Sequence, residues 1–267
     1  MATDFTGIAA RYERDSLIQK SAAEKLFSLL AISGNDNVLD LGCGTGNLTR
    51  KIRGMTTGRV AGIDPSEGMI GAADNQGEHD NISYAVNRAE EFDIMNEFDV
   101  IFCNSAFQWF QNPHHALRNC HSALHKGGRM GIQAPARLIY CPNFVSAVEA
   151  VARSPLTRET FAGFNAPWIF LETANEYESL FADAGFSVPF ARIEELKTLH
   201  TADEVMTIFE SGAAAGYLNQ AFYEPRIDPE YAENFRRLVK EEFAGQAREN
   251  GLVELLFNRI YLVAVKE

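Results

Sequence analysis

The sequence predicts an α/β fold in which a mostly parallel sheet is covered by helices and extended by helical cap segments. Short apolar runs alternate with charged, amphipathic segments from about residue 34 to 134, which is the spacing of strands joined by helices. Such units are right-handed, so we expect helices on both faces of the sheet. After residue 135 the alternation is lost, and prolines and aromatic residues are mixed with polar residues, which favours a cap. The 267 residues are expected to form one domain, with a core at about 34–134, 186–200 and 252–267 and a cap at about 1–33, 135–185 and 201–250.

The elements of the core follow from periodicity and from the residues that begin and end helices. Apolar residues recur at helical spacing in 16–32, and this helix is expected to end at Ser33 and Gly34. The helix expected at 113–128 begins with proline and ends with glycines, as helices often do. Two further helices are expected at 47–55 and 67–76, and strands at 37–41, 58–64, 82–87, 98–104 and 129–134.

The second half of the chain predicts fewer regular elements. A helix within 168–183 is expected to end near Gly185, and an extended segment is expected at 188–196. Residues 201–245 have a helical pattern, and the apolar run 253–266 predicts a closing strand. Helical segments therefore separate the last two strands.

Composition and charge exclude several classes of protein. The net charge of −12 argues against nucleic acid as a partner, because such binding needs a dense basic face. The N-terminal segment carries charges throughout and no run of about 18 apolar residues occurs, so we expect a cytoplasmic protein with no membrane partner. The four cysteines lack metal-binding spacing and are expected to be reduced thiols. His121 and His125 are one helical turn apart without a third ligand, so no metal is expected.

A glycine loop follows the first predicted strand, in the stretch VLDLGCGTGN. Ligands in open α/β sheets bind beyond the carboxyl ends of the strands, and Gly42, Gly44 and Gly46 let a ligand approach the backbone there. The dinucleotide fingerprint Gly-x-Gly-x-x-Gly is not matched, because Asn47 stands where its last glycine would be. The carboxylate of Asp40 suits a cation better than a pyrophosphate.

A second acid, Asp64, ends the next predicted strand, where a carboxylate can accept hydrogen bonds from both hydroxyls of a ribose. The two acids and the glycine loop together fit S-adenosylmethionine, which carries an ammonium group, a sulfonium and a ribose. The alternative is a turn loop with a capping acid. The pattern therefore predicts an adenosylmethionine site at this edge of the sheet.

The chain resembles the class I S-adenosylmethionine-dependent methyltransferases over nearly its whole length. The stretch VLDLGCGTGNLTR is similar to the first motif of that family, GIDPSEGMI to the second, FDVIFCNSAFQWF to the fourth-strand motif and LHKGGRM to the entry into the fifth strand. The resemblance implies a Rossmann-like sheet of seven strands with a reversed final strand, which the closing run LFNRIYLVAVK fits. It also implies that Asp40 serves the cofactor ammonium, that Asp64 serves the ribose, and that S-adenosyl-L-homocysteine is the product.

The resemblance assigns further residues to the cofactor. Met69 would pack near the adenine. Where the family commonly has Asp to bind the adenine amino group this chain has Arg88, so that contact would pass to the backbone of Ala89 or to Glu90. The residues implied to bind the cofactor are Tyr12, Ser16, Asp40, Gly42, Gly44, Gly46, Asp64, Met69, Ala89, Glu90 and Asn104.

A closer similarity is to the methyltransferases of carboxylates, including those acting on trans-aconitate, malonyl-carrier protein, juvenile hormone acid, salicylate and jasmonate. It rests on Tyr12, Ser16 and Gln19 at the spacing of the plant enzymes, together with the stretch SAFQWF. An ionised carboxylate needs no general base, so the site needs neutral donors that hold one oxygen and aim the other. Gln19 and the indole N–H of Trp109 are the candidate catalytic donors. Tyr12 would shield the sulfonium, and Ser16 would reach the cofactor carboxylate.

Several alternatives stay open at this point, because each of these side chains also fits a surface or packing role. The acceptor could be an amine, a phenol or carbon, for which a base is expected, or the chain could bind the cofactor without chemistry. A small or fatty organic acid is the expected substrate and small-molecule partner, and an acyl carrier protein is a second candidate. Any of the cap arginines Arg137, Arg153 and Arg158 could pair with a second carboxylate on the substrate.

Overall fold

The structure, a computed structural model, describes residues 17–75 and 81–267, with the side chains of the first helix described from Ala22 onward. Among these residues seven strands form one sheet, in the order β3-β2-β1-β4-β5-β7-β6. The strands are β1 (Val38–Leu41), β2 (Val60–Asp64), β3 (Ile82–Val86), β4 (Phe98–Asn104), β5 (Leu124–Pro135), β6 (Ser187–Thr201) and β7 (Leu252–Val265). The helices are α2 (Leu17–Leu30), α3 (Asn47–Arg53), α4 (Glu67–Asp74), η2 (Phe107–Trp109), α5 (Pro113–Ala123), α6 (Pro142–Arg153), α7 (Arg158–Phe161), α8 (Ala174–Asp183), α9 (Ala202–Glu210), α10 (Ala214–Tyr217), η3 (Gln220–Phe222) and α11 (Pro229–Gly245).

The sheet is parallel except for its last strand. β1 pairs in parallel with β2 and β4, β2 with β3, and β4 with β5. β7 lies between β5 and β6 and runs antiparallel to both. The α/β class, the seven strands and the reversed final strand are therefore confirmed in the described part of the chain.

Helices cover both faces of the sheet because alternate residues of a strand point to opposite sides. In β1, Val38 packs into a cluster with Leu26 and Leu30 of α2. The next residue, Leu39, packs into the cluster that holds α5 and α8, including Phe181. Strands that are buried on both faces have continuous apolar sequences, and this pattern predicts them from the sequence.

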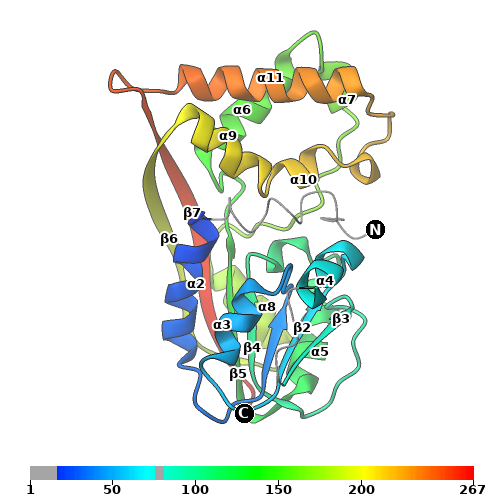
Figure 1. The fold of residues 1–267 in the computed structure, drawn as a ribbon, viewed down its shortest axis with the longest axis vertical. Helices are drawn as coiled ribbons and strands as arrows, with labels where there is room; N and C mark the ends of the chain where they lie inside the picture. The colour runs from blue at the N-terminus through cyan, green and yellow to red at the C-terminus, as the bar shows by residue number, and fades with distance from the viewer. Residues whose placement is uncertain (1–16, 76–80) are drawn as a thin grey trace.

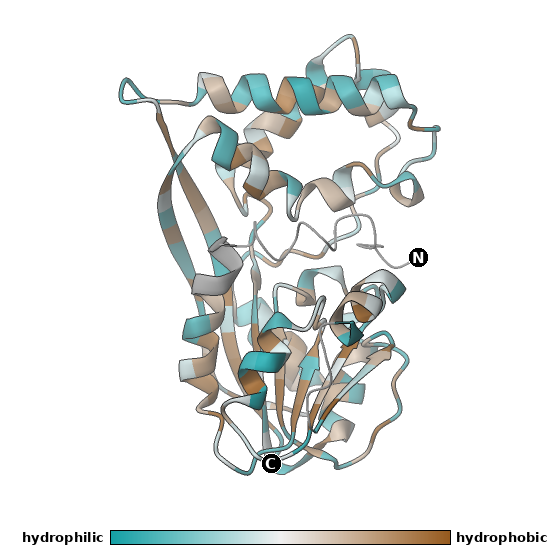
Figure 2. Cartoon of the chain, viewed as in Figure 1, coloured by the Kyte–Doolittle hydropathy of each residue, from teal (hydrophilic) through white to brown (hydrophobic). Residues whose placement is uncertain are grey.

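A cap lies beyond the carboxyl ends of the strands, and α6, α9, α10 and α11 lie together there (Figure 1). Its core contains Phe144, Phe209 and Phe235, together with Val253 and Leu255 from the near end of β7. The strands β6 and β7, 15 and 14 residues long, run from the sheet up to this core. On α11 buried aromatic and aliphatic residues alternate with polar ones, so hydrophobic and hydrophilic bands follow one another along it in Figure 2.

The structure corrects the expected helix at 113–128. This helix ends at Ala123, because Leu124 already pairs with Phe98 and belongs to β5. The glycines that were expected to end the helix lie inside the strand, where its register shifts against β4 and Gly127 has a φ of 82°. They mark an irregularity of the strand rather than a helix terminus.

The cap also differs in detail from the expectation. The helical pattern of 201–245 is confirmed, but it is divided into α9, α10 and α11. The sequence does not predict helix α6, because a proline such as Pro142 commonly interrupts regular structure. Pro142 instead occupies the first turn of α6, where its missing N–H costs nothing and its fixed φ suits the helix.

All four cysteines are buried and unpaired, as the sequence predicts. Burial raises the pKa of the Cys141 thiol to about 12, so this thiol stays protonated at neutral pH. Among the described residues, no helix has both the length and the hydropathy that crossing a membrane would require.

Candidate functional site

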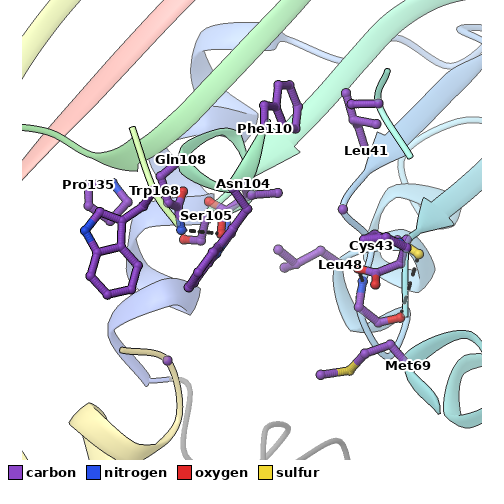
Figure 3. Close-up of a pocket in the computed structure, with 18 of the residues that line it drawn as sticks. Leu41, Cys43, Leu48, Met69, Asn104, Ser105, Gln108, Phe110, Pro135 and Trp168 are labelled. Carbon is purple, nitrogen blue, oxygen red and sulfur yellow. Dashed lines mark hydrogen bonds between the residues drawn. The ribbon is translucent and has the colours of Figure 1, made fainter. Parts of the chain in front are cut away.

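A cavity opens between the carboxyl ends of the strands and the cap, with an empty volume of about 1880 Å³ when its open mouth is included. The loop half of the cavity is lined by residues within 41–48, 63–69 and 87–90, which follow β1, β2 and β3. The cap half is lined by residues within 104–110, 135–170, 208–213 and 257–259. Figure 3 shows the two halves facing each other, with Leu48 and Met69 on one side and Gln108 and Trp168 on the other.

The glycine loop between β1 and α3 has a left-handed backbone at all three glycines. The φ angle is 78° at Gly42, 54° at Gly44 and 79° at Gly46, values that L side chains rarely adopt. A Cβ atom at Gly42 would collide with Cβ of Ala106, and one at Gly46 would collide with the hydroxyl of Tyr84. A Cβ atom at Gly44 would meet no atom within 4 Å. Side chains at positions 42 and 46 are therefore excluded by the chain itself, whereas Gly44 leaves open space in the cavity wall.

Asp64 ends β2 and joins the glycine loop to the next turn. Its Oδ2 accepts a hydrogen bond from the N–H of Gly44 at 3.0 Å, and its Oδ1 accepts one from the N–H of Ser66 at 2.9 Å. The side chain is 9% exposed and lines the loop half. Because each carboxylate oxygen has two lone pairs, Asp64 can hold the loop and still accept hydrogen bonds from a ligand.

Asp40 lies behind the glycine loop and does not line the cavity. It is 2% exposed, and its Oδ2 accepts a hydrogen bond from Oγ1 of Thr49 at 2.6 Å. Burial raises the pKa of the Asp40 carboxyl from 3.8 to about 7; the hydrogen bond from Thr49 opposes this rise and the charge of Asp64 adds to it. A cation bound in the loop half would lower this pKa, since it favours the charged form of a neighbouring carboxylate.

Met69 and Ala89 are buried residues that also line the loop half of the cavity. The carbonyl of Ala89 accepts a hydrogen bond from Nδ2 of Asn119 at 3.2 Å. Its N–H has no acceptor among the described residues. An apolar surface next to a backbone donor suits a heteroaromatic ring that carries an acceptor nitrogen.

Glu90 is held by the start of α5. Its Oε1 accepts hydrogen bonds from the N–H groups of Gln111 at 2.6 Å and Asn112 at 3.1 Å. Arg88, at the position where the family commonly has Asp, pairs with Glu90 at 3.8 Å and with Glu91 at 3.6 Å. The charge of Arg88 is thus partly neutralised by its neighbours, although both Arg88 and Glu90 line the cavity.

A buried polar network lies at the end of β4, where Asn104 and Ser105 line the cavity. Ser105 has a φ of 58°, and its N–H donates to the carbonyl of Gln133 at 2.7 Å. The amide of Gln133, oriented by its hydrogen bonds, donates to Oδ1 of Asn104 and Oγ of Ser105, each at 3.0 Å. Its oxygen accepts from Nη1 of Arg259 at 2.7 Å. Nε2 of Gln108 donates to the carbonyl of Ser105 at 2.8 Å, whereas its buried Oε1 has no hydrogen-bond partner among the described residues.

Two tryptophans form the aromatic wall of the cap half. The rings of Trp109 and Trp168 meet edge to face, with centroids 5.5 Å apart. The rings of Tyr140 and Phe170, tilted by 30° with centroids 4.9 Å apart, continue this wall. A Cβ atom at Gly216 would collide with the ring of Trp168, so the small residues of α10 let the cap approach the tryptophans.

The cavity wall contains most of the residues that the resemblance implies for the cofactor. Trp109 lines its cap half. Gly46 and Asp40 lie outside the wall. Those that line the cavity are Gly42, Gly44, Asp64, Met69, Ala89, Glu90 and Asn104.

Three predicted residues lie outside the described part of the chain. Tyr12 and Ser16 precede residue 17, and Gln19 lies in α2 at a position whose side chain is not described. Their roles in shielding the sulfonium, reaching the cofactor and holding the acceptor stay predictions.

The three cap arginines that could have paired with a second carboxylate of the substrate do not line the cavity. Nη1 of Arg137 donates to Oδ1 of Asn258 at 3.1 Å, Arg153 forms an exposed ion pair within α6, and Arg158 begins α7. The cap half instead contains Arg259 of β7, which is 5% exposed and was missed in the sequence. Its signal was a charged residue in the middle of the apolar run LLFNRIYLVAV.

In the segments that the structure describes, no group of three or more His, Cys, Asp or Glu side chains could hold a metal ion. The polar groups of the cavity are carboxylates, amides, backbone N–H groups and arginines. These suit an organic ligand with both donors and acceptors.

Comparison with known proteins agrees with this geometry. Residues 38–128 match the family model described as a methyltransferase domain. The chain is 31% identical over 120 residues to a malonyl-[acyl-carrier protein] O-methyltransferase of Bacillus cereus, a match that spans 43% of the chain and 45% of that relative, or about half its length. It is 23% identical to the protein of that name from Acetivibrio thermocellus, over 98% of the chain and 92% of the relative. An uncharacterized methyltransferase of Schizosaccharomyces pombe is 26% identical over 97% of each chain.

Solved structures share the fold at low identity. A putative methyltransferase in complex with the Trm112 methyltransferase activator of Haloferax volcanii superimposes with a TM-score of 0.60 at 19% identity, over 98% of this chain and 97% of that one. An S-adenosylmethionine dependent methyltransferase from Mesorhizobium loti superimposes with a TM-score of 0.52 at 17% identity, over 91% and 96% of the two chains. At this level of identity these likenesses support the architecture alone.

Proposed function

We propose that this chain, which carries the domain and the fold of the S-adenosylmethionine-dependent methyltransferases, methylates a carboxylate of a small organic acid. The observation that carries the proposal is the single cavity with two unlike halves. Its loop half presents a glycine, backbone donors and acids, and its cap half presents an aromatic wall. A cofactor in the loop half and an acceptor in the cap half would meet near the end of β4.

The loop half fits adenosylmethionine group by group. Asp64 offers lone pairs to the ribose hydroxyls, and Gly44 leaves room for the ligand to lie against the backbone. The buried surface of Met69 and the N–H of Ala89 suit the adenine ring. On the opposite side of the cavity, in the cap half, Oε1 of Gln108 has no hydrogen-bond partner among the described residues, and an ammonium group of the cofactor can donate to it. The residues present therefore fit this cofactor.

A carboxyl acceptor is supported because it needs no general base from the site. Adenosylmethionine, when bound, supplies a methyl group on a positively charged sulfur. A carboxylic acid is already ionised near pH 7, so the chain needs to orient one oxygen and exclude water rather than remove a proton. Trp109 and Trp168 provide an apolar wall for that purpose, and the indole N–H of Trp109 together with Gln19 would hold the other oxygen.

The relatives named malonyl-[acyl-carrier protein] O-methyltransferase support the same acceptor chemistry. They also make a carrier-bound thioester a candidate form of the substrate. On this chain the exposed basic residues of α11 are already paired, Arg236 with Glu210 and Arg237 with Glu241, so an acidic carrier would have to compete with these pairs. A free acid or a small thioester is therefore the first substrate to test.

Isotope transfer tests the proposal directly. The protein is incubated with adenosylmethionine labelled in its methyl group and with a panel of acids, amines and phenols, and the labelled products are treated with base. A base-labile methyl ester is the expected product. Label found only in base-stable products would replace the carboxyl acceptor by nitrogen, phenolic oxygen or carbon. Calorimetric binding of the cofactor without transfer to any acceptor would indicate a binding protein.

A further inference from the structure

A second hollow, which we call the outer groove, lies in the cap beside the cavity. Its volume is about 520 Å³ when its open mouth is included. One side is a stripe of α6, formed by Val145, Val148 and Ala152 at the spacing of one helical face. Phe161 of α7 and Leu138 also line it. Because Leu138 is 71% exposed, the groove meets solvent at an apolar side chain.

The outer groove offers little charge to an occupant. Among the described residues that line it, Glu149 is the only one with a charged side chain, and it forms an exposed ion pair with Arg153 at 3.2 Å. The other lining residues are aliphatic or aromatic. Burial raises the pKa of the Tyr217 hydroxyl to about 12, so this group stays neutral. A charged occupant would lose its hydration without gaining a partner, whereas an apolar occupant would be stabilised by leaving water.

The outer groove shares a wall with the cavity. Tyr140, Trp168 and Phe170 line both hollows. On the cavity side, the ring of Trp168 meets that of Trp109, which follows β4. A ligand that begins near the end of β4 and passes Trp168 therefore enters the outer groove.

Trp168 is held in this wall by packing. Its ring contacts Trp109, Phe164, Phe170 and Tyr217, and its indole N–H forms no hydrogen bond with another described residue. The side chain is also partly exposed. Rotation of such a ring breaks no hydrogen bond, so Trp168 can move aside for a ligand that replaces its apolar contacts.

We propose, on the basis of the proposed function, that the outer groove binds an alkyl chain of the acceptor, which passes Trp168 while its carboxylate reacts near the end of β4. The acceptor is then a monocarboxylic acid with an aliphatic tail. A malonyl group has no such tail, so this acceptor differs from the one in the names of the relatives. Each methylene group that moves from water into apolar contact should tighten binding about fourfold.

A chain-length series tests the proposal. Steady-state methyl transfer is measured for straight-chain acids from butanoate to dodecanoate. KM should fall as the chain grows while kcat changes little, because contacts remote from the reacting atoms bind the ground state and the transition state alike. The fall should continue to the longest acids, since the outer groove adds apolar surface beyond the cavity. Equal KM values for hexanoate and dodecanoate would overturn the proposal.

Two variants separate the outer groove from the cavity. Ala152→Phe fills the groove from α6 at a position that does not line the cavity, and should raise the KM of dodecanoate on the order of 30-fold while leaving butanoate unchanged. Leu138→Asp places a charge at the exposed mouth and should cause a smaller rise for dodecanoate alone. Ala162→Phe is the matched control, because Ala162 is exposed beside α7 and lines neither hollow. A general loss of structure would not separate long acids from short ones.

Binding provides a readout that does not depend on turnover. In calorimetry with S-adenosyl-L-homocysteine present, wild type should bind dodecanoate more tightly than butanoate. Ala152→Phe should abolish this difference without changing the affinity for S-adenosyl-L-homocysteine. Equal losses for both acids, or no loss for either, would overturn the proposal. Failure of wild type to form any labelled ester, with the binding difference intact, would instead overturn the proposed function and support the groove as an alkyl site.

Discussion

The two halves of the cavity are built in different ways. The loop half is made largely of backbone groups and acids supplied by three successive turns after β1, β2 and β3. The cap half is made of side chains from segments far apart in the chain, such as Trp109, Tyr140, Trp168, Ile208 and Arg259. Under the proposed function, a cofactor shared by many enzymes would contact local backbone groups. The acceptor would contact side chains that only the folded chain brings together.

The two halves also differ in what supports them. The glycine loop is held by contacts within the sheet core, through Ala106, Tyr84 and Asp64. The cap half rests on a separate aromatic core, in which the ring of Phe144 meets Phe209 at 5.1 Å. Changes in the first region should therefore alter stability and cofactor binding, and changes in the second should alter the handling of the acceptor.

The largest expected effect compares two glycines of the loop. Gly42→Ala adds a methyl group that collides with Ala106 at a left-handed φ, and should lower the free energy of unfolding by about 3 kcal/mol. Gly44→Ala has the same kind of φ but open space, and should cost only about 1 kcal/mol while weakening cofactor binding. Chemical denaturation and calorimetry with S-adenosyl-L-homocysteine measure both quantities. Equal losses of stability would show that the chain itself does not exclude the side chain at 42.

The second prediction concerns the acid at the end of β2. Asp64→Ala removes the proposed acceptor for the ribose and the anchor of the Gly44 N–H, so the dissociation constant of S-adenosyl-L-homocysteine should rise about 100-fold. Asp99→Ala is the control, because Asp99 also accepts a backbone N–H, that of Asn37 at 2.8 Å, but does not line the cavity. Asp99→Ala should lower the free energy of unfolding without changing the dissociation constant of S-adenosyl-L-homocysteine. A similar affinity loss in both variants would contradict a direct contact.

A smaller effect should be confined to the cap half. Trp109→Phe removes the indole N–H and part of the contact with Trp168, so kcat/KM for the acceptor should fall about tenfold while cofactor affinity stays the same. Tyr231→Phe, which removes a hydroxyl from the cap core outside the cavity, serves as the control. A comparable fall in that variant would mean that the cap responds as a whole rather than through Trp109.

The fourth prediction is a pH dependence of stability. The pKa of Asp40 is raised to about 7 in the folded chain, so the folded state holds a proton that the unfolded state releases above about pH 4. The stabilisation that this proton gives to the folded state is fully present below about pH 4. It is lost as pH rises toward 7, by about 1.4 kcal/mol of unfolding free energy per pH unit. The free energy of unfolding of Asp40→Asn should therefore rise relative to that of wild type as the pH is raised from 5 to 6.5, as measured by denaturant titration. A difference between the two proteins that does not change with pH would refute the raised pKa.

The difference between the halves also explains which positions the sequence could locate. The sequence locates Asp64 and the glycine loop at the edge of the sheet, because the turns after parallel strands are short and lie together there. Even so, the sequence could not distinguish Gly44, which borders the cavity, from Gly42 and Gly46, which face Ala106 and Tyr84. That distinction depends on residues that are distant along the chain. The strands were predicted well, and the end of α5 was not, because pairing of Leu124 with Phe98 overrides the local glycine signal.

The sequence by itself determined the α/β class, the covered parallel sheet and the place of the glycine loop, because periodicity and turn residues are local properties. Only the tertiary structure decided that Arg259 rather than Arg137, Arg153 or Arg158 lines the cap half, and that Gln133 links Arg259 to Asn104. The physical reason is that a strand places alternate side chains on opposite faces, and only strand order and register decide which of them reaches a cavity.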